Sequence, residues 1–94
     1  MHVGICTIEL RLPGNSSLKG KRSVIKSITS RVTREFNVSI AEVDAQDAWQ
    51  QAVLGVSCVS SSADYAHGQL ERVVGWIEDN RPDVELLSYQ IEML

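Results

Sequence analysis

In HVGICTIELRLPGNSSLKGKRSVIKSITSRVTREF, residues 2–36, the spacing of the apolar residues changes partway along and indicates a strand followed by a helix. From His2 to Leu12 apolar and polar residues come to alternate, which predicts a half-buried strand. From Leu18 to Phe36 the apolar residues fall on one side of a helical wheel, which predicts a helix with one buried stripe. A Pro-Gly-Asn turn separates the two segments, and Ser16 or Ser17 can cap the helix.

The remaining sequence predicts four more elements. In chain order they are a strand at 38–43, a strand at 52–60, a helix with apolar residues from 66 to 77, and a strand at 84–94. The order βαββαβ predicts an α+β, ferredoxin-like fold, with two helices packed on one face of a four-stranded antiparallel sheet. The last strand is expected to place Leu87, Tyr89, Ile91 and Met93 on one side. The other face of the sheet is expected to expose Ile5, Thr7, Val84 and Leu86.

Length and composition narrow the class of protein. With 94 residues and 10.4 kDa, residues 1–94 are expected to form a single ferredoxin-like domain. No apolar run approaches the roughly 20 residues of a membrane span, and no secretory leader is recognisable. Two cysteines do not make a disulfide framework, so we expect a reduced, cytoplasmic protein without membrane contact.

The net charge of −3 conceals a strong asymmetry along the chain. Residues 1–34 carry seven basic residues and one acid, whereas residues 35–94 carry two basic residues and eleven acids. A segment with a net charge of +6 therefore precedes one with a net charge of −9. Such polarity predicts a polyanion partner for the first segment despite the negative total.

The basic residues cluster where the first helix is expected to begin. Lys19, Lys21 and Arg22 lie in the first turn, where the positive end of the helix dipole disfavours cations, and Lys26 follows. Free backbone amides beside these side chains predict a site for the phosphate groups of RNA. The alternative is a solvated face, or ion pairs with acids such as Glu9. The central strands offer no aromatic residue for base stacking, so binding through phosphates is favoured over reading of bases on the sheet.

A second candidate site lies between the second and third strands. Trp49 and Gln50 can anchor a partner, or the indole can cap the end of the sheet. The neighbouring acids Glu42, Asp44 and Asp47 can serve acid–base chemistry or bind a divalent cation, although a solvated hairpin is the commoner arrangement.

Catalytic, metal and cofactor motifs are not found elsewhere. Cys6 and Cys58 lie on apolar strands without the spacing of a redox or iron–sulfur motif, which favours buried thiols. His2 and His67 have no nucleophile at a recognisable spacing and are expected to be solvated. No glycine-rich nucleotide loop is present, so we expect no catalytic residues, no metal site and no cofactor.

Three motifs resemble a known family. They are SLKGKRSV at 17–24, FNVSIAEV at 36–43 and DAWQQA at 47–52. The order and spacing of these motifs make the chain similar to the YlxP-like family of small bacterial proteins. The resemblance implies a ferredoxin-like α+β fold and a ribosome-related role, because family genes commonly lie beside genes for translation initiation and small-subunit maturation. It implies no catalytic residue, and Gly20 departs from the polar or acidic residue common at that position, which predicts a looser first turn.

The sequence thus predicts a non-enzymatic accessory factor that contacts the small ribosomal subunit or its RNA through Lys19, Lys21, Arg22 and Lys26. The alternative is a structural module that forms a homodimer through the open sheet face. An enzyme that uses the acids at 42–47 is a third hypothesis.

Overall fold

The computed structural model describes all 94 residues, and its elements alternate between strand and helix. They are β1 (His2–Arg11), α1 (Leu18–Glu35), β2 (Ser39–Asp44), β3 (Gln51–Ser60), α2 (Ala63–Asn80) and β4 (Glu85–Met93). The order βαββαβ confirms the prediction, and β2 begins and ends one residue later than expected.

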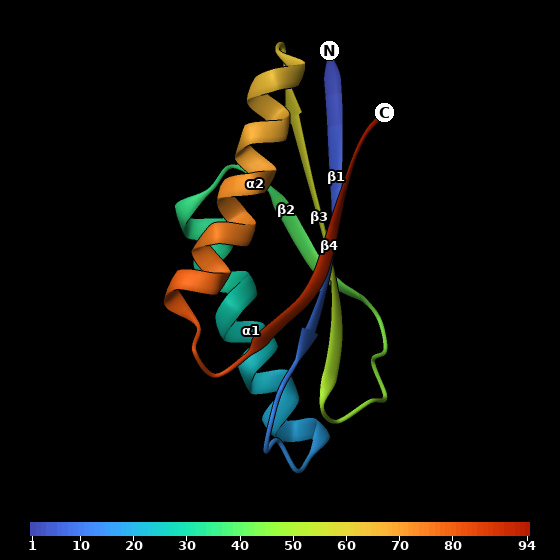
Figure 1. Cartoon of the computed structure of the whole chain (residues 1–94), viewed down its shortest axis with the longest axis vertical. Helices are drawn as coiled ribbons and strands as arrows, with labels where there is room; N and C mark the ends of the chain where they lie inside the picture. The colour runs from blue at the N-terminus through green and yellow to red at the C-terminus, as the bar shows by residue number, and fades with distance from the viewer.

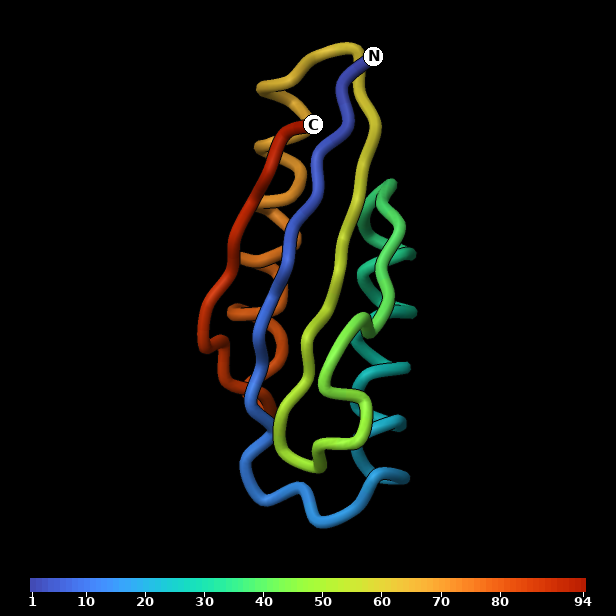
Figure 2. Tube along the Cα trace, turned by 90° about the vertical axis from the view of Figure 1, so that its right-hand side faces the viewer, coloured from blue at the N-terminus to red at the C-terminus, as the bar shows by residue number.

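The four strands form one antiparallel sheet in the order β2-β3-β1-β4. Figure 2 shows the strands side by side with both helices behind them, so one face of the sheet is left open. α2 lies over β1, β3 and β4, whereas α1 lies over β2 at one edge (Figure 1). This is the ferredoxin-like α+β arrangement that the sequence predicts.

The hydrophobic core fills the space between the sheet and the helices. Alternate residues of β1 and β3 point into it, as the period of two requires, and α1 and α2 each contribute an apolar stripe. Its strand residues are Cys6, Ile8, Leu10, Ala52, Leu54, Val56 and Cys58. Neither helix combines the length and the apolar character that a membrane crossing requires.

Serine side chains begin both helices. The hydroxyl of Ser17 accepts a hydrogen bond from the amide of Gly20 at 2.9 Å, and that of Ser62 accepts one from the amide of Tyr65 at 3.2 Å. Each bond satisfies an amide that has no partner within the helix. Ser17, rather than Ser16, is therefore the cap of α1.

The expected alternation along β4 is wrong at one end. Ser88 pairs with Glu9 but Leu86 pairs with Leu10, so one additional residue bulges out of β4. The bulge turns Leu86 toward the core and leaves Leu87 44% exposed. Val84 also packs against the core. The prediction that Val84 and Leu86 lie on the open face is therefore wrong.

Candidate functional site

Two segments that are distant in sequence meet at one end of the molecule. The turn before α1 and the loop between β2 and β3 lie together at the bottom of Figure 2. The side-chain amide Nδ2 of Asn15 donates to the carbonyl oxygens of Ser17 at 2.8 Å and Trp49 at 2.6 Å. Gln50 completes the connection by donating to the carbonyl of Asn15 at 3.1 Å. The residues of the first and third sequence motifs therefore build one surface.

The side chain of Lys21 is buried, whereas the sequence analysis assigns it to phosphate binding. Its side chain is only 2% exposed, and its ammonium donates to the carbonyls of Ala45 at 2.6 Å and Ala48 at 2.8 Å. It also forms an ion pair with Oε2 of Glu42 at 2.7 Å. Two hydrogen bonds and one ion pair hold the buried ammonium, so Lys21 fixes the β2–β3 loop to α1 and cannot contact a phosphate. Its assignment to phosphate binding is corrected.

The reason for this position can be found in the sequence. Lys21, Ile25, Ile28 and Val32 follow the spacing i, i+4, i+7, i+11, which is the buried stripe of α1. Glu42 likewise lies two residues after Ile40, on the inner side of β2. A lysine within an apolar stripe and an acid on the inner side of the adjacent strand are together the signal for this ion pair.

Gly20 does not leave the first turn open. A Cβ atom at this position would lie 2.6 Å from Oδ1 of Asn15, which is shorter than side chains tolerate. Asn15 is held in place by its two bonds to carbonyl oxygens, so it cannot move away without losing them. The glycine allows Asn15 to connect the helix start to the β2–β3 loop.

The other cations of α1 form an exposed basic face. Lys19, Arg22, Lys26 and Arg34 are all exposed, on the side of the helix opposite its buried stripe. None of them has a carboxylate oxygen within 4.0 Å, since the three ion pairs of the molecule involve Arg11, Lys21 and Arg81. Arg31 instead lies 5.9 Å from the ring centroid of Trp76. The basic face is therefore free to meet an external anion.

Trp49 lies on the loop that Lys21 and Asn15 hold. Its side chain is 54% exposed although its carbonyl is bonded to Asn15. The loop turns through Ala45, whose φ of 58° is a conformation that non-glycine residues seldom adopt. Ala48 and Gln50, on either side of Trp49, line a hollow of about 430 Å³ together with Arg11, Gln51 and Leu87. An aromatic side chain is thus presented to solvent by a fixed backbone.

The acids near this loop have structural contacts. Glu42 is paired with Lys21, and Oδ1 of Asp44 accepts a hydrogen bond from the amide of Ala45 at 2.7 Å. Asp47 is exposed on the loop. No group of three or more His, Cys, Asp or Glu side chains is arranged to hold a metal ion.

The cysteines and histidines lie outside any such arrangement. Cys6 and Cys58 are buried free thiols, as predicted, and burial raises the pKa of both. The Cys58 thiol lies 3.5 Å from the carbonyl oxygen of Ala66. His2 and His67 are exposed, as predicted.

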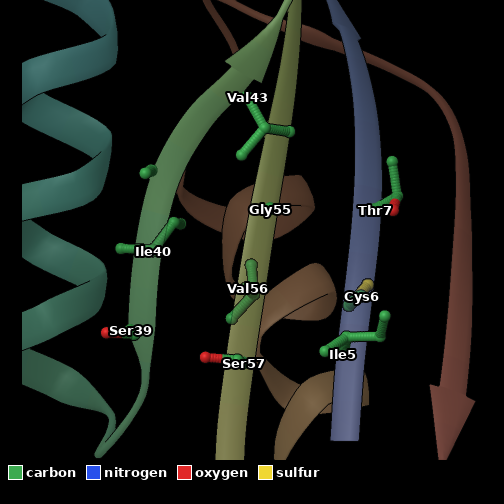
Figure 3. Close-up of a pocket in the computed structure, with 10 residues that line it drawn as sticks. Ile5, Cys6, Thr7, Ser39, Ile40, Val43, Gly55, Val56 and Ser57 are labelled. Atoms are coloured by element: carbon green, nitrogen blue, oxygen red, sulfur yellow. The ribbon is translucent and has the colours of Figure 1, made fainter.

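The open face of the sheet carries a shallow hollow of about 410 Å³ (Figure 3). Gly55 forms its floor, and Val43 from β2 leans over this glycine so closely that a Cβ there would lie 2.9 Å from Cγ1 of Val43. Ile5, Thr7 and Ser57 are among the other residues that line the hollow. The face contains no aromatic side chain on its central strands, in agreement with the sequence analysis.

The arrangement of strands and helices defines a ferredoxin-like α+β protein. Comparison of sequences identifies its family: the model described as "Protein of unknown function (DUF503)" matches residues 3–91, and the chain belongs to this family. The "Uncharacterized protein YlxP" of Bacillus subtilis (strain 168) is 41% identical over 83 residues, which cover 88% of this chain and 89% of that protein. The predicted YlxP-like relationship is confirmed.

Among solved structures, the "De novo designed protein Foldit4" has a similar backbone. It matches with a TM-score of 0.54 and 14% identity, over 100% of this chain and 97% of that chain. At this identity the similarity concerns the fold alone.

Proposed function

We propose that the protein is a non-enzymatic accessory factor that binds the phosphate backbone of RNA, with small-subunit ribosomal RNA as its partner. The observation that carries this proposal is the row of exposed, unpaired cations on α1: Lys19, Arg22, Lys26 and Arg34. Cations that point into solvent without carboxylate partners bind phosphates without first breaking an ion pair. The ribosomal partner follows from the role that the YlxP-like resemblance implies.

The geometry of α1 suits a polymer rather than a single phosphate. Residues 19 and 34 are separated by about 22 Å along the helix axis at ~1.5 Å per residue. Ser23 and Ser30 lie among the cations and offer hydroxyl donors to phosphate oxygens, whereas the hydroxyl of Thr33 donates to the carbonyl of Thr29 at 2.8 Å. Contacts of this kind position a nucleic acid without reading its sequence, so we expect little preference for particular bases.

Trp49 adds an aromatic group at the end of α1 where the basic face begins. Asn15 and Lys21 fix the backbone around it, so little order has to be gained when a partner stacks on the exposed ring. We propose that Trp49, with Gln50 beside it, contacts an unpaired base or a protein surface next to the bound phosphates.

The test is filter binding to small-subunit ribosomal RNA over a range of salt concentrations. Replacing Arg22 and Lys26 by alanine should weaken binding about tenfold or more near 100 mM salt and reduce the dependence on salt. The matched control replaces Arg72 and Arg81, which lie outside α1 and do not line the hollow beside Trp49, by alanine and changes the net charge equally. No binding at low salt, or equal weakening by both double variants, would contradict the proposal.

The open sheet face supports a second candidate function, a structural module that pairs with a second copy. The hollow beside Gly55 exposes the apolar side chains of Ile5 and Val43 together, and Val43 is 53% exposed. A small domain seldom leaves such a surface bare. Light scattering at tens of micromolar should then give twice the 10.4 kDa of one chain, and Ile5→Lys should restore the mass of one chain. A single-chain mass for the unaltered protein would reject this function.

A further inference from the structure

The edge of the sheet opposite α1 is an unpaired strand. β4 is the last strand in the order β2-β3-β1-β4, and no strand pairs with its outer side over nine residues (Figure 2). The amide of Leu94 donates to the carbonyl of Val3 at 2.9 Å, which fixes the alternation of backbone groups along β4. Since these groups alternate in an antiparallel pair, those of Tyr89, Ile91 and Met93 point away from β1. The free edge therefore offers three amides and three carbonyls.

The side chains beside this edge are acidic. Oε2 of Glu71 on α2 accepts a hydrogen bond from the hydroxyl of Tyr89 at 2.9 Å, so this flank of the helix lies along β4. Glu78 lies two turns further along the same flank, and both carboxylates raise the pKa of Tyr89. On the open-face side of the same strand, Glu92 is exposed.

The few arginines near the β4 edge have other contacts and do not neutralise Glu71, Glu78 or Glu92. Residues 63–94 carry seven acids against Arg72 and Arg81. Arg81 is paired with Asp83 at 2.7 Å, and Arg72 lies 5.5 Å from the ring centroid of Tyr65. At the lower end of the edge, Arg11 is paired with Glu85 at 2.8 Å. Glu71, Glu78 and Glu92 are left without cationic partners.

We propose that the β4 edge binds an extended, lysine- or arginine-rich protein segment, which adds a fifth strand to the sheet beside Tyr89, Ile91 and Met93 and places basic side chains against Glu71 and Glu78. Backbone hydrogen bonds supply the affinity of such strand addition, and the alternate side chains supply the selectivity. Along α2 the two glutamates are separated by about 10 Å. Side chains on one face of a strand repeat every ~6.8 Å, so neighbouring basic residues on that face reach both carboxylates.

The β4 strand of a second copy does not suit the same edge. A two-fold pairing of β4 with itself about Tyr89 would bring Glu71, which is bonded to that tyrosine, toward the Glu71 of the other copy. Like charges at that position oppose the pairing. The acidic flank thus disfavours pairing of β4 with itself and favours a basic partner. This interaction does not depend on RNA binding by α1, which lies over β2 at the opposite edge.

The experiment uses a fluorescent synthetic peptide as long as β4 in which lysine alternates with threonine or valine, and measures anisotropy at low salt. Binding should protect the amides of Tyr89, Ile91 and Met93 from hydrogen exchange. Alternate peptide amides point toward β4, so two N-methylated peptides are compared, one methylated at the lysines and the other at the intervening residues. One of these two peptides should lose binding and the other should keep it. Equal effects of the two methylated peptides would overturn the proposal.

A matched pair of variants separates the acidic flank from the overall charge. Glu71→Gln with Glu78→Gln should weaken peptide binding at least about fivefold, because the desolvated partners of the lysines are lost. Asp44→Asn with Asp47→Asn makes the same change of charge at the β2–β3 loop and should have little effect. No binding of the lysine peptide to the unaltered protein, equal weakening by both pairs, or protection of amides outside β4 would each overturn the proposal.

Discussion

Lys21 shows how one side chain can serve the site without touching a ligand. Its ammonium joins α1 to two carbonyls of the β2–β3 loop and to Glu42, while the neighbouring Lys19 is exposed. This buried cation determines the position of the loop, and the loop in turn presents Trp49. The exposed cations and the aromatic ring depend on this contact for their relative placement.

Lys21→Met should therefore destabilise the fold strongly. Removing the cation leaves Glu42 and two carbonyls without a partner, which costs about 3 kcal/mol in the free energy of unfolding. Lys21→Met with Glu42→Leu should recover part of that loss, because the unpaired carboxylate is also removed. Urea denaturation measures both, with Lys19→Met as the control expected to change stability by less than about 0.5 kcal/mol. Equal effects at residues 19 and 21 would contradict the structural role of Lys21.

The Cys6 thiol predicts a loss of stability at alkaline pH. Burial, assisted by the nearby Glu71 carboxylate, raises the pKa of Cys6 from about 9 to about 11. Between these values the unfolded chain releases a proton that the folded protein retains. The contribution of the Cys6 thiol to the free energy of unfolding is therefore fully present below pH 9 and declines as the pH rises to 11. The decline attributable to this thiol is about 2 to 3 kcal/mol. Denaturation of Cys6→Ala should show a correspondingly shallower decline, and identical curves would refute the prediction.

Among the helices and strands, periodic apolar patterns predicted the elements correctly, whereas features confined to a single residue were missed. Alternation in β1 and the stripe of α1 are periodic, so they predicted the strand, the helix and their buried sides. The bulge in β4 inserts a single residue near Leu87, and no periodic pattern announces it, so the faces of Leu86 and Leu87 were exchanged. The sequence analysis assigns Lys21 to phosphate binding, although its position follows the buried stripe of α1. The free backbone edge of β4 depends on strand order, which emerges only from the tertiary fold.

The two helices offer a matched pair of glycines that tests the start of α1. Gly75 in α2 has nothing within 4 Å of where a Cβ would be, so Gly75→Ala should stabilise the protein by about 0.5 to 1 kcal/mol through helix propensity. Gly20→Ala gains the same propensity but displaces Asn15 from its two carbonyl partners, so we expect a net loss of about 1 kcal/mol. Thermal unfolding measures both variants. Stabilisation by Gly20→Ala would show that Asn15 is not needed to hold the loop.

At the scale of the whole molecule, the asymmetry of the sequence becomes an asymmetry in space. The basic face belongs to α1 over the β2 edge, whereas the acids of residues 63–94 belong to α2 and β4 at the other side (Figure 2). Near 0.1 M salt each region acts on other molecules only within a screening length of about 10 Å, so the two edges of the sheet act as separate surfaces. The two proposed sites, one for a polyanion and one for a basic segment, thus lie at opposite edges of one sheet.

This separation predicts attraction between copies of a protein whose net charge is negative. At low salt the basic α1 of one molecule should attract the acidic β4 side of another, which gives a negative second virial coefficient in light scattering. About 150 mM salt shortens the screening length to ~8 Å and should abolish the attraction. Replacing Lys19, Arg22 and Lys26 by glutamine changes the net charge from −3 to −6 and should turn the low-salt interaction repulsive. A positive second virial coefficient for the unaltered protein at low salt would mean that its molecules repel one another. The charge asymmetry would then be too weak to guide a partner to either edge, because attraction of a partner relies on the same electric field as attraction between copies.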